Sequence, residues 1–314
     1  MDNKDIWTLT YPRIIVIIII LFPICNFFKS NSLIGYYDEF IAVVSIVILF
    51  KYKLGYSFEK SDKWILYGMF IVTAIGIASN AISGLTSNLF AILVDVLWLW
   101  KIFATFLAFK YISAKNNRRR KILKLLDPIA KFAIGFVCAS ALIGEIIDIG
   151  VTGSTVIGVI KAFNFFWTNG IQTGWLVFCC VLIVSAAENN RKNILRYLII
   201  ALIPLILTFS SLVWCWCFLA ISVLILLREN AEIKVWSIAL IVAGVIVLNY
   251  ADISTYLVGG HIRGTLIRYG IITAQNYFPF GSGFATYGSE MAVRDYSQLY
   301  VKYGWASTWA FGRE

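Results

Sequence analysis

The stretch LFAILVDVLWLWKIFATFLAF, residues 89–109, is an almost unbroken run of apolar side chains. A helix needs about 20 such residues to cross the roughly 30 Å of hydrocarbon in a bilayer. The other long apolar runs are 14–28, 33–50, 64–80, 129–147, 170–187, 198–209, 212–227 and 235–250. The sequence therefore predicts an all-α chain, a polytopic transmembrane helical bundle of about nine spans.

The composition excludes a soluble globular domain. Of the 314 residues, 60% are hydrophobic and only 14% are charged, whereas soluble domains are about 45–50% apolar and about 25% charged. The net charge of +10 does not indicate a nucleic-acid partner, because the basic residues fall in short loops between the apolar runs. No small-residue cleavage site follows the first apolar run, so we expect it to be retained as a span.

Positive charge is distributed unevenly among the loops. The loops rich in lysine and arginine are 51–63, 110–124 and 191–196. The loop at 81–88 has no charge at all. Because basic loops stay in the cytoplasm, we expect a cytoplasmic N-terminus and, after nine spans, an extracytoplasmic C-terminal segment. The predicted division is a transmembrane bundle at 1–250 and an outer-face segment at 251–314.

This span count depends on residues 197–227, which carry no charge. The run is too long for one upright span and barely long enough for two. Pro204 and the polar residues within 208–211 interrupt it, which favours a hairpin of two short helices. The alternative is one tilted span, which would place residues 251–314 in the cytoplasm.

Two charged residues, Asp95 and Lys101, lie inside the apolar run at 89–109. Six positions apart on a helix, they point about 120° away from each other and do not form an ideal pair. Charges within a span indicate pairing with other helices or a water-filled cavity. The alternative is that Lys101 marks the end of a shifted span.

Two further features of the predicted bundle are the aromatic segment 150–170 and the cysteines. For 150–170 we expect a re-entrant or interfacial helix on the outer face. The six cysteines all lie in or beside apolar runs, without CxxC spacing or a nearby histidine. They are typical of buried small side chains, and no metal site is expected.

Residues 259–303 gather arginines, the only histidine, carboxylates, tyrosines and glycines in about 45 positions. Ile262, Leu266 and Tyr269 recur at helical spacing, which predicts a helix. The run Pro279-Phe-Gly281-Ser-Gly283 predicts a turn whose glycines allow the backbone to approach a neighbour or a ligand.

Arg263 and Arg268 are candidate ligands for a phosphate, since the guanidinium fork donates paired hydrogen bonds to phosphate oxygens. On one helix they point about 140° apart. They reach one ligand together only if the helix begins after Arg263 or if the anion is wide. The alternative is that both extend to lipid headgroups at a membrane surface.

The other polar side chains of this segment have two interpretations each. His261, Glu290 and Asp295 are candidate proton-transfer groups, or else solvated surface residues. Tyr287 and Tyr296 suit stacking on sugar rings, or else belong to an interfacial aromatic belt.

The segment resembles the loop of bacterial O-antigen polymerases and ligases. The motifs that carry the resemblance are Arg263-Gly-Thr-Leu-Ile-Arg268, Tyr277-Phe-Pro-Phe-Gly281-Ser-Gly283-Phe, Thr286-Tyr-Gly288-Ser and Tyr296-Ser-x-x-Tyr300-x-x-Tyr303-Gly. The resemblance implies a GT-C-like fold in the bacterial inner membrane and glycosyl transfer from undecaprenyl-pyrophosphate-linked glycans, without a cofactor or metal. Together with the resemblance, the residues of this segment give a candidate substrate-binding set of Arg263, Arg268, Tyr269, Gly281, Gly283, Tyr287 and Tyr296. The candidate catalytic residues His261, Glu290 and Asp295 are chosen from their own chemistry, because the catalytic histidine of the ligase branch lies in a later part of the chain and does not map onto His261.

Two departures from that family stand out. Many relatives carry a Ser-Arg pair where this chain has Ser211-Leu212, and further spans follow the loop, whereas this sequence ends at Glu314. We therefore expect part of the family layout to be missing. Either the chain is a truncated product, for which an inactive protein is the alternative, or the missing part lies outside this sequence. The expected function is polymerisation of lipid-linked repeat units, with membrane lipids and a chain-length regulator as further partners. The alternatives are an O-antigen ligase, and a flippase that uses Asp95 and Lys101.

Overall fold

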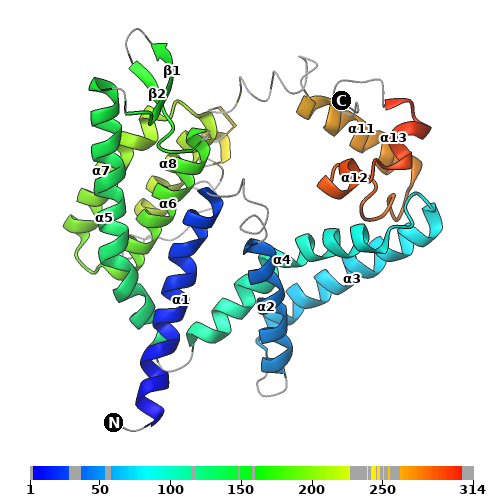
Figure 1. Cartoon of the computed structure of the whole chain (residues 1–314), viewed down its shortest axis with the longest axis horizontal. Coiled ribbons are helices and arrows are strands. Elements are labelled where there is room, and N and C mark those ends of the chain that lie inside the picture. Colours follow the sequence, from blue (N-terminus) through cyan, green and yellow to red (C-terminus); the bar gives the residue numbers. More distant parts are fainter. Residues whose placement is uncertain are drawn as a thin grey trace. The chain divides into compact units, whose positions relative to one another are not determined.

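The computed structural model consists almost entirely of helices (Figure 1). It describes residues 3–27, 37–53, 58–114, 117–147, 149–157, 160–167, 169–226, 239, 242–244, 246–247, 250, 254 and 262–305. The helices are α1 (Asn3–Phe27), α2 (Tyr37–Lys53), α3 (Lys60–Ser83), α4 (Leu89–Ala114), α5 (Arg118–Ile146), α6 (Gly170–Ala187), α7 (Arg191–Leu207), α8 (Ser211–Leu226), α11 (Ile262–Asn276), α12 (Glu290–Arg294) and α13 (Gln298–Lys302). Two short strands, β1 (Thr152–Ile157) and β2 (Ile160–Phe163), form one hairpin. The helical prediction is therefore confirmed.

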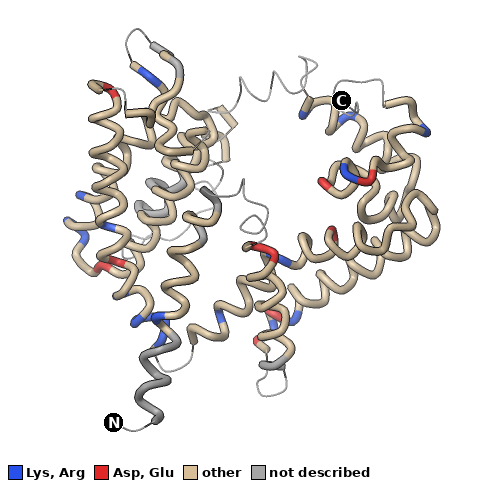
Figure 2. Tube along the Cα trace, in the orientation of Figure 1, with Lys and Arg blue, Asp and Glu red and all other residues tan. Residues whose placement is uncertain are grey.

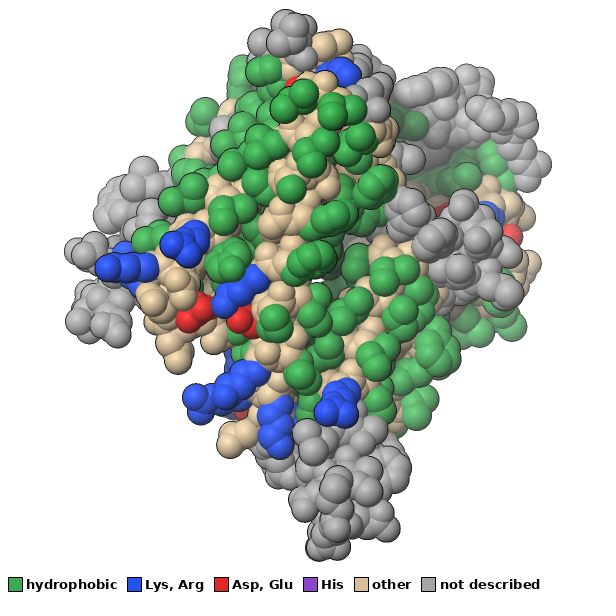
Figure 3. Space-filling model, turned by 60° about the vertical axis from the view of Figure 1, so that its left-hand side comes forward, with side chains coloured by type: hydrophobic (Ala, Val, Ile, Leu, Met, Phe, Trp, Pro, Cys, Tyr) green, Lys and Arg blue, Asp and Glu red, His purple; other side chains and the backbone are tan. Residues whose placement is uncertain are grey.

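Among the described residues, four helices are long and apolar enough to cross a membrane: α3, α4, α5 and α6. Their outward side chains are strongly apolar; Phe90, Ile102 and Phe132 are about 70% exposed, as suits contact with lipid rather than water. Figure 3 shows one face where hydrophobic side chains predominate and lysines and arginines gather toward one end. The count of about nine spans and the GT-C-like arrangement remain predictions.

The chain divides into two compact units. The first joins residues 1–34 to 113–252, and the second joins 35–112 to 253–314. The division predicted from the sequence, 1–250 and 251–314, separates the transmembrane bundle from the outer-face segment. It is a different kind of division and stays a prediction. In the second unit, residues 262–305 pack on α3 and α4.

The first unit is built around α5, α6, α7 and α8, whose buried side chains form one apolar cluster. Gly174 of α6 lies against Val213 of α8. Four residues further along α6, the ring of Phe178 stacks on that of Trp216, at 6.3 Å between centroids. Because the contacting residues move toward the C-terminus on both helices, α8 runs parallel to α6. The helix between them in the sequence, α7, runs back in the opposite direction.

Residues 197–226 therefore belong to two helices, α7 and α8, as the hairpin interpretation predicts. The break falls at Thr208, Phe209 and Ser210, between α7 and α8. The Thr208 hydroxyl donates to the Leu205 carbonyl at 2.8 Å, and Phe209 has a left-handed φ of 49°. A tilted single helix is excluded, while the side of the membrane on which each end lies stays a prediction.

The helix expected at 150–170 is wrong, because β1 and β2 form an antiparallel hairpin there. Thr152, Thr155 and Ile157 are β-branched and favour extended backbone. The hairpin also buries Phe163 completely in the core of the first unit. Aromatic content alone did not distinguish this packing from that of an interfacial helix.

Candidate functional site

Residues 262–305 form a small cap on the end of the α3–α4 hairpin (Figure 1). Its core buries Leu85, from the loop that joins α3 to α4, together with Ala292, Leu299, Tyr300 and Trp305. Hydrogen bonds from the cap also reach α3 and α4, as described below. The cap therefore lies at the end of α3 and α4 that carries the uncharged loop 81–88. The lysine-rich ends of these two helices are at the opposite end, as Figure 2 shows.

The cap's non-helical backbone is held by polar side chains of α3. Ser79 Oγ donates to the Phe280 carbonyl at 2.8 Å, and Ser83 Oγ donates to the Ser282 carbonyl at 2.9 Å. Asn80 holds both backbone groups of Phe284: its Nδ2 donates to the carbonyl at 2.8 Å and its Oδ1 accepts the N–H at 2.7 Å. Irregular backbone beside apolar helices needs such partners, because an unpaired polar group there is costly.

The glycine-rich turn approaches α3 as the sequence predicted. Gly283 has φ +97°, and a Cβ built on it would lie 2.8 Å from the backbone nitrogen of Asn80. The ring of Phe284 lies directly over Gly76. Gly76 is seven residues before the end of α3, so the turn reaches about 10 Å along the helix. Gly281 also has a positive φ, +83°, but no described neighbour within 4 Å of such a Cβ.

Asp95 and Lys101 have separate partners, in agreement with the prediction that they do not pair with each other. Asp95 is 9% exposed, and its Oδ2 accepts the backbone N–H of Ala285 at 2.7 Å. Its Oδ1 has no hydrogen-bond partner among the described residues. Lys101 forms an ion pair with Asp38 of α2. Asp95 therefore fixes the cap on α4, and Lys101 fixes α2 on α4.

Both candidate arginines are exposed on α11. The helix α11 begins at Ile262, so Arg263 lies inside it. The two arginines are therefore on one helix and point about 140° apart, as expected for that case. Ile267 and Ile271, both more than half exposed, lie between the two arginines around the helix, about 40° and 80° from Arg263. Only a wide anion, such as a diphosphate, reaches both guanidinium groups from this helix.

The predicted tyrosines are largely used in packing. Tyr269 stacks on Trp305 with 4.3 Å between centroids and an interplanar angle of 8°. Tyr287 donates its hydroxyl to the Leu266 carbonyl, and burial raises the pKa of Tyr287 to about 12. Tyr296 packs edge to face on Tyr300. Tyr269 and Tyr287 therefore hold α11 against the rest of the cap, whereas Tyr296 packs on α13. Tyr287 is a neutral donor at physiological pH.

The candidate carboxylates already have partners. Glu290 pairs with Arg294 at 2.7 Å, and both side chains are about half exposed. Asp295 Oδ2 accepts a hydrogen bond from Asn88 Nδ2 at 2.6 Å, which ties the cap to the start of α4. Both carboxylates are exposed, but among the described residues only that of Asp295 contacts an element outside residues 262–305. His261 lies outside the described residues.

Sequence reasoning missed the residues that receive the cap. Ser79, Asn80 and Ser83 fall at helical spacing near the end of one apolar run, and that polar face is the signal that could have indicated a partner. Trp305, which stacks between Tyr269 and Tyr303, had no signal in the sequence pattern.

Comparison with known proteins gives no relative. No protein-family model, no curated protein and no solved structure matches this chain. Within the described ranges, no group of three or more histidine, cysteine, aspartate or glutamate side chains could hold a metal ion. The interpretation of the cap therefore depends on its geometry and on the motif resemblance.

Proposed function

We propose that this chain is a membrane glycosyltransferase that polymerises undecaprenyl-pyrophosphate-linked oligosaccharide repeat units at the outer face of the bacterial inner membrane. The observation that carries the proposal is the position of α11. It presents Arg263 and Arg268 from the uncharged end of the α3–α4 hairpin. If the lysine-rich ends of α3 and α4 are cytoplasmic, as their charge indicates, both arginines lie on the outer side.

The chemistry follows from charge and exposure. A glycosyl diphosphate develops negative charge on its leaving diphosphate as the bond to the anomeric carbon breaks. Two guanidinium groups stabilise that charge, because they keep their positive charge at all physiological pH values and donate paired hydrogen bonds. The exposed isoleucines on α11, Ile267 and Ile271, suit the adjoining lipid chain.

The acceptor is a hydroxyl of a second lipid-linked repeat unit. Its oxygen forms the new bond to the anomeric carbon, the bond to the diphosphate oxygen breaks, and undecaprenyl diphosphate leaves. Glu290, half exposed beside Arg294, is the candidate base for the hydroxyl proton. Asp295 has a positioning role in this account, since it bonds Asn88.

The flippase alternative draws no support from the two intramembrane charges. Lys101 pairs with Asp38 of α2, and Asp95 holds Ala285. Both contacts hold elements of one unit together, whereas a translocation path needs charges that face a cavity.

A strain without this chain tests the proposal against the ligase alternative. We expect its surface glycan to be limited to single repeat units, because polymerisation fails while attachment of a unit continues. The measurement is the glycan length distribution by gel electrophoresis, together with extraction of lipid-linked material. Full-length polymer that remains lipid-linked and unattached would contradict the proposal and favour a ligase.

A further inference from the structure

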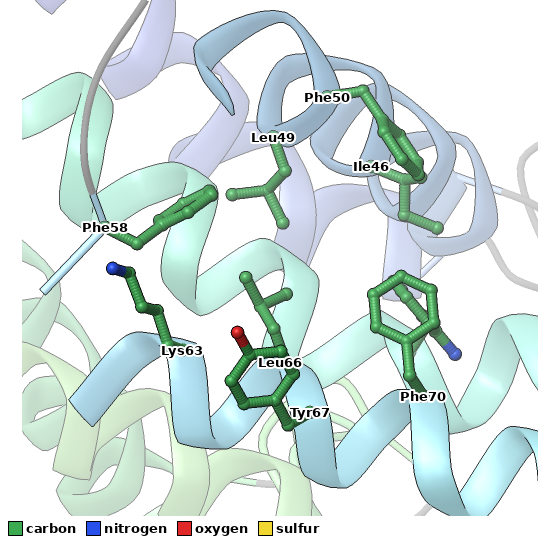
Figure 4. Close-up of a pocket in the computed structure, with 9 residues that line it drawn as sticks. Ile46, Leu49, Phe50, Phe58, Lys63, Leu66, Tyr67 and Phe70 are labelled. Atoms are coloured by element: carbon green, nitrogen blue, oxygen red, sulfur yellow. The ribbon is translucent and has the colours of Figure 1, made fainter. Parts of the chain in front are cut away.

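A separate cavity of about 160 Å³ lies at the other end of the second unit, between α2, α3 and α4 (Figure 4). Its lining residues are Ile46, Leu49, Phe50, Phe58, Lys63, Leu66, Tyr67, Phe70 and Trp100. Seven of these are purely aliphatic or aromatic side chains or the indole of Trp100. The indole N–H donates to Thr73 Oγ1 at 2.9 Å, so it needs no hydrogen-bond acceptor inside the cavity.

Such a cavity favours hydrocarbon over water. An enclosed apolar cavity of about 150 Å³ stays dry and accepts small apolar ligands such as benzene. This one has a similar lining but is open on one side, since Phe50 and Tyr67 are both 56% exposed. Water entering this one would find few hydrogen-bond partners beyond the Tyr67 hydroxyl and the Lys63 ammonium. The cavity therefore has room for a segment of one hydrocarbon chain.

The cation at the rim is Lys63. The nearest carboxylates in sequence, Glu59 and Asp62, are both held by Lys110, at 2.7 and 2.9 Å. Asp62 is buried and also accepts a hydrogen bond from Tyr111. Among the described residues Lys63 has no ion pair, so its charge is available to an anion at the mouth of the cavity.

The charged and apolar side chains along the cavity follow the same order as the headgroup and the hydrocarbon chain of a lipid. Figure 4 shows Lys63 and Phe58 at one end and Phe70 at the other. Lys63 lies in the first turn of α3, and Phe70 is seven residues further, or about 10 Å deeper along the helix. A phosphate at the helix end and a hydrocarbon chain beside α3 match this order of cation and apolar wall.

We propose that this cavity binds one chain of an anionic phospholipid, whose phosphate contacts the Lys63 ammonium at the lysine-rich end of α2, α3 and α4. The site is independent of the proposed glycosyltransferase site, because it uses none of the cap residues. A phospholipid is favoured because Lys63 is at the end of the helix, where phospholipid headgroups lie.

Native mass spectrometry of the full chain in detergent tests this site, with dioleoyl-phosphatidylglycerol and dioleoyl-phosphatidylcholine as probes. We expect phosphatidylglycerol to bind at least tenfold more tightly, and Lys63→Gln to remove about tenfold of that affinity, as for a charge-assisted contact. Lys60→Gln is the matched control, because Lys60 is exposed in the same turn but does not line the cavity. It should retain the preference.

A second variant, Leu66→Trp, fills the cavity and should reduce binding of both lipids, provided that its melting temperature stays close to that of the native chain. Lys63 is exposed, so Lys63→Gln keeps the test decisive if Leu66→Trp does not fold. Equal binding of the two lipids, equal losses in Lys63→Gln and Lys60→Gln, or tighter binding of undecaprenyl phosphate than of phosphatidylglycerol would each overturn the proposal.

Discussion

Replacing Arg263 and Arg268 together by alanine is expected to abolish detectable polymer. Hydrogen bonds to a charged partner contribute about 1.5–3 kcal/mol each, so each arginine accounts for roughly a 10- to 150-fold change in rate. Both side chains are exposed, and the variant should therefore still fold. The measurement is polymer length and amount in the deletion strain, complemented with each variant at matched protein level.

The matched control removes the same charge from a basic loop of the first unit. Arg119 and Arg120 are exposed in the first turn of α5, and Arg119→Ala with Arg120→Ala should retain polymer formation if the membrane orientation is unchanged. The single variants Arg263→Lys and Arg268→Lys keep the charge but lose the paired donors, and an intermediate loss is expected. Normal polymer from the Arg263→Ala and Arg268→Ala double variant would contradict the proposed site.

Gly283→Ala is expected to release the cap from α3. The new Cβ would lie 2.8 Å from the backbone nitrogen of Asn80, which cannot move without disturbing the helix. The left-handed φ of +97° adds backbone strain of roughly 1–2 kcal/mol, and the collision adds roughly 1–3 kcal/mol. We expect a lower unfolding free energy in detergent and faster tryptic cleavage after Arg268.

Gly281→Ala separates the two causes. Its φ of +83° imposes similar backbone strain, but no described atom lies within 4 Å of the added Cβ. The loss of unfolding free energy should therefore be limited to the backbone strain of roughly 1–2 kcal/mol, without the contribution of the collision. Equal effects of the two substitutions would show that the close approach of the turn to Asn80 contributes nothing.

The helix at 262–276 and the turn at 279–283 were predictable because their signals are local. Apolar residues at helical spacing and glycines beside a proline determine backbone conformation over a few positions. The break between α7 and α8 had the same kind of signal, since Pro204 and polar residues interrupt an apolar run.

The partners of these elements were not predictable, because they lie about 200 residues away in sequence. Nothing near Phe284 indicates that Asn80 holds both of its backbone groups. The β-hairpin at 152–163 was missed for a similar reason, since its stability depends on the burial of Phe163 against α5, α6 and α7. Tyr269 and Tyr287 were interpreted as ligand-binding, whereas long-range packing engages both.

The most direct test of the central claim is the side of the membrane on which α11 lies. Gln275 is exposed on α11 and Lys60 is exposed at the opposite end of α3, so Gln275→Cys and Lys60→Cys form a matched pair. With a membrane-impermeant maleimide on intact spheroplasts, the account predicts labelling of Gln275→Cys at once and of Lys60→Cys only after permeabilisation. Labelling of Gln275→Cys only after permeabilisation would place both arginines in the cytoplasm and contradict the proposed enzyme.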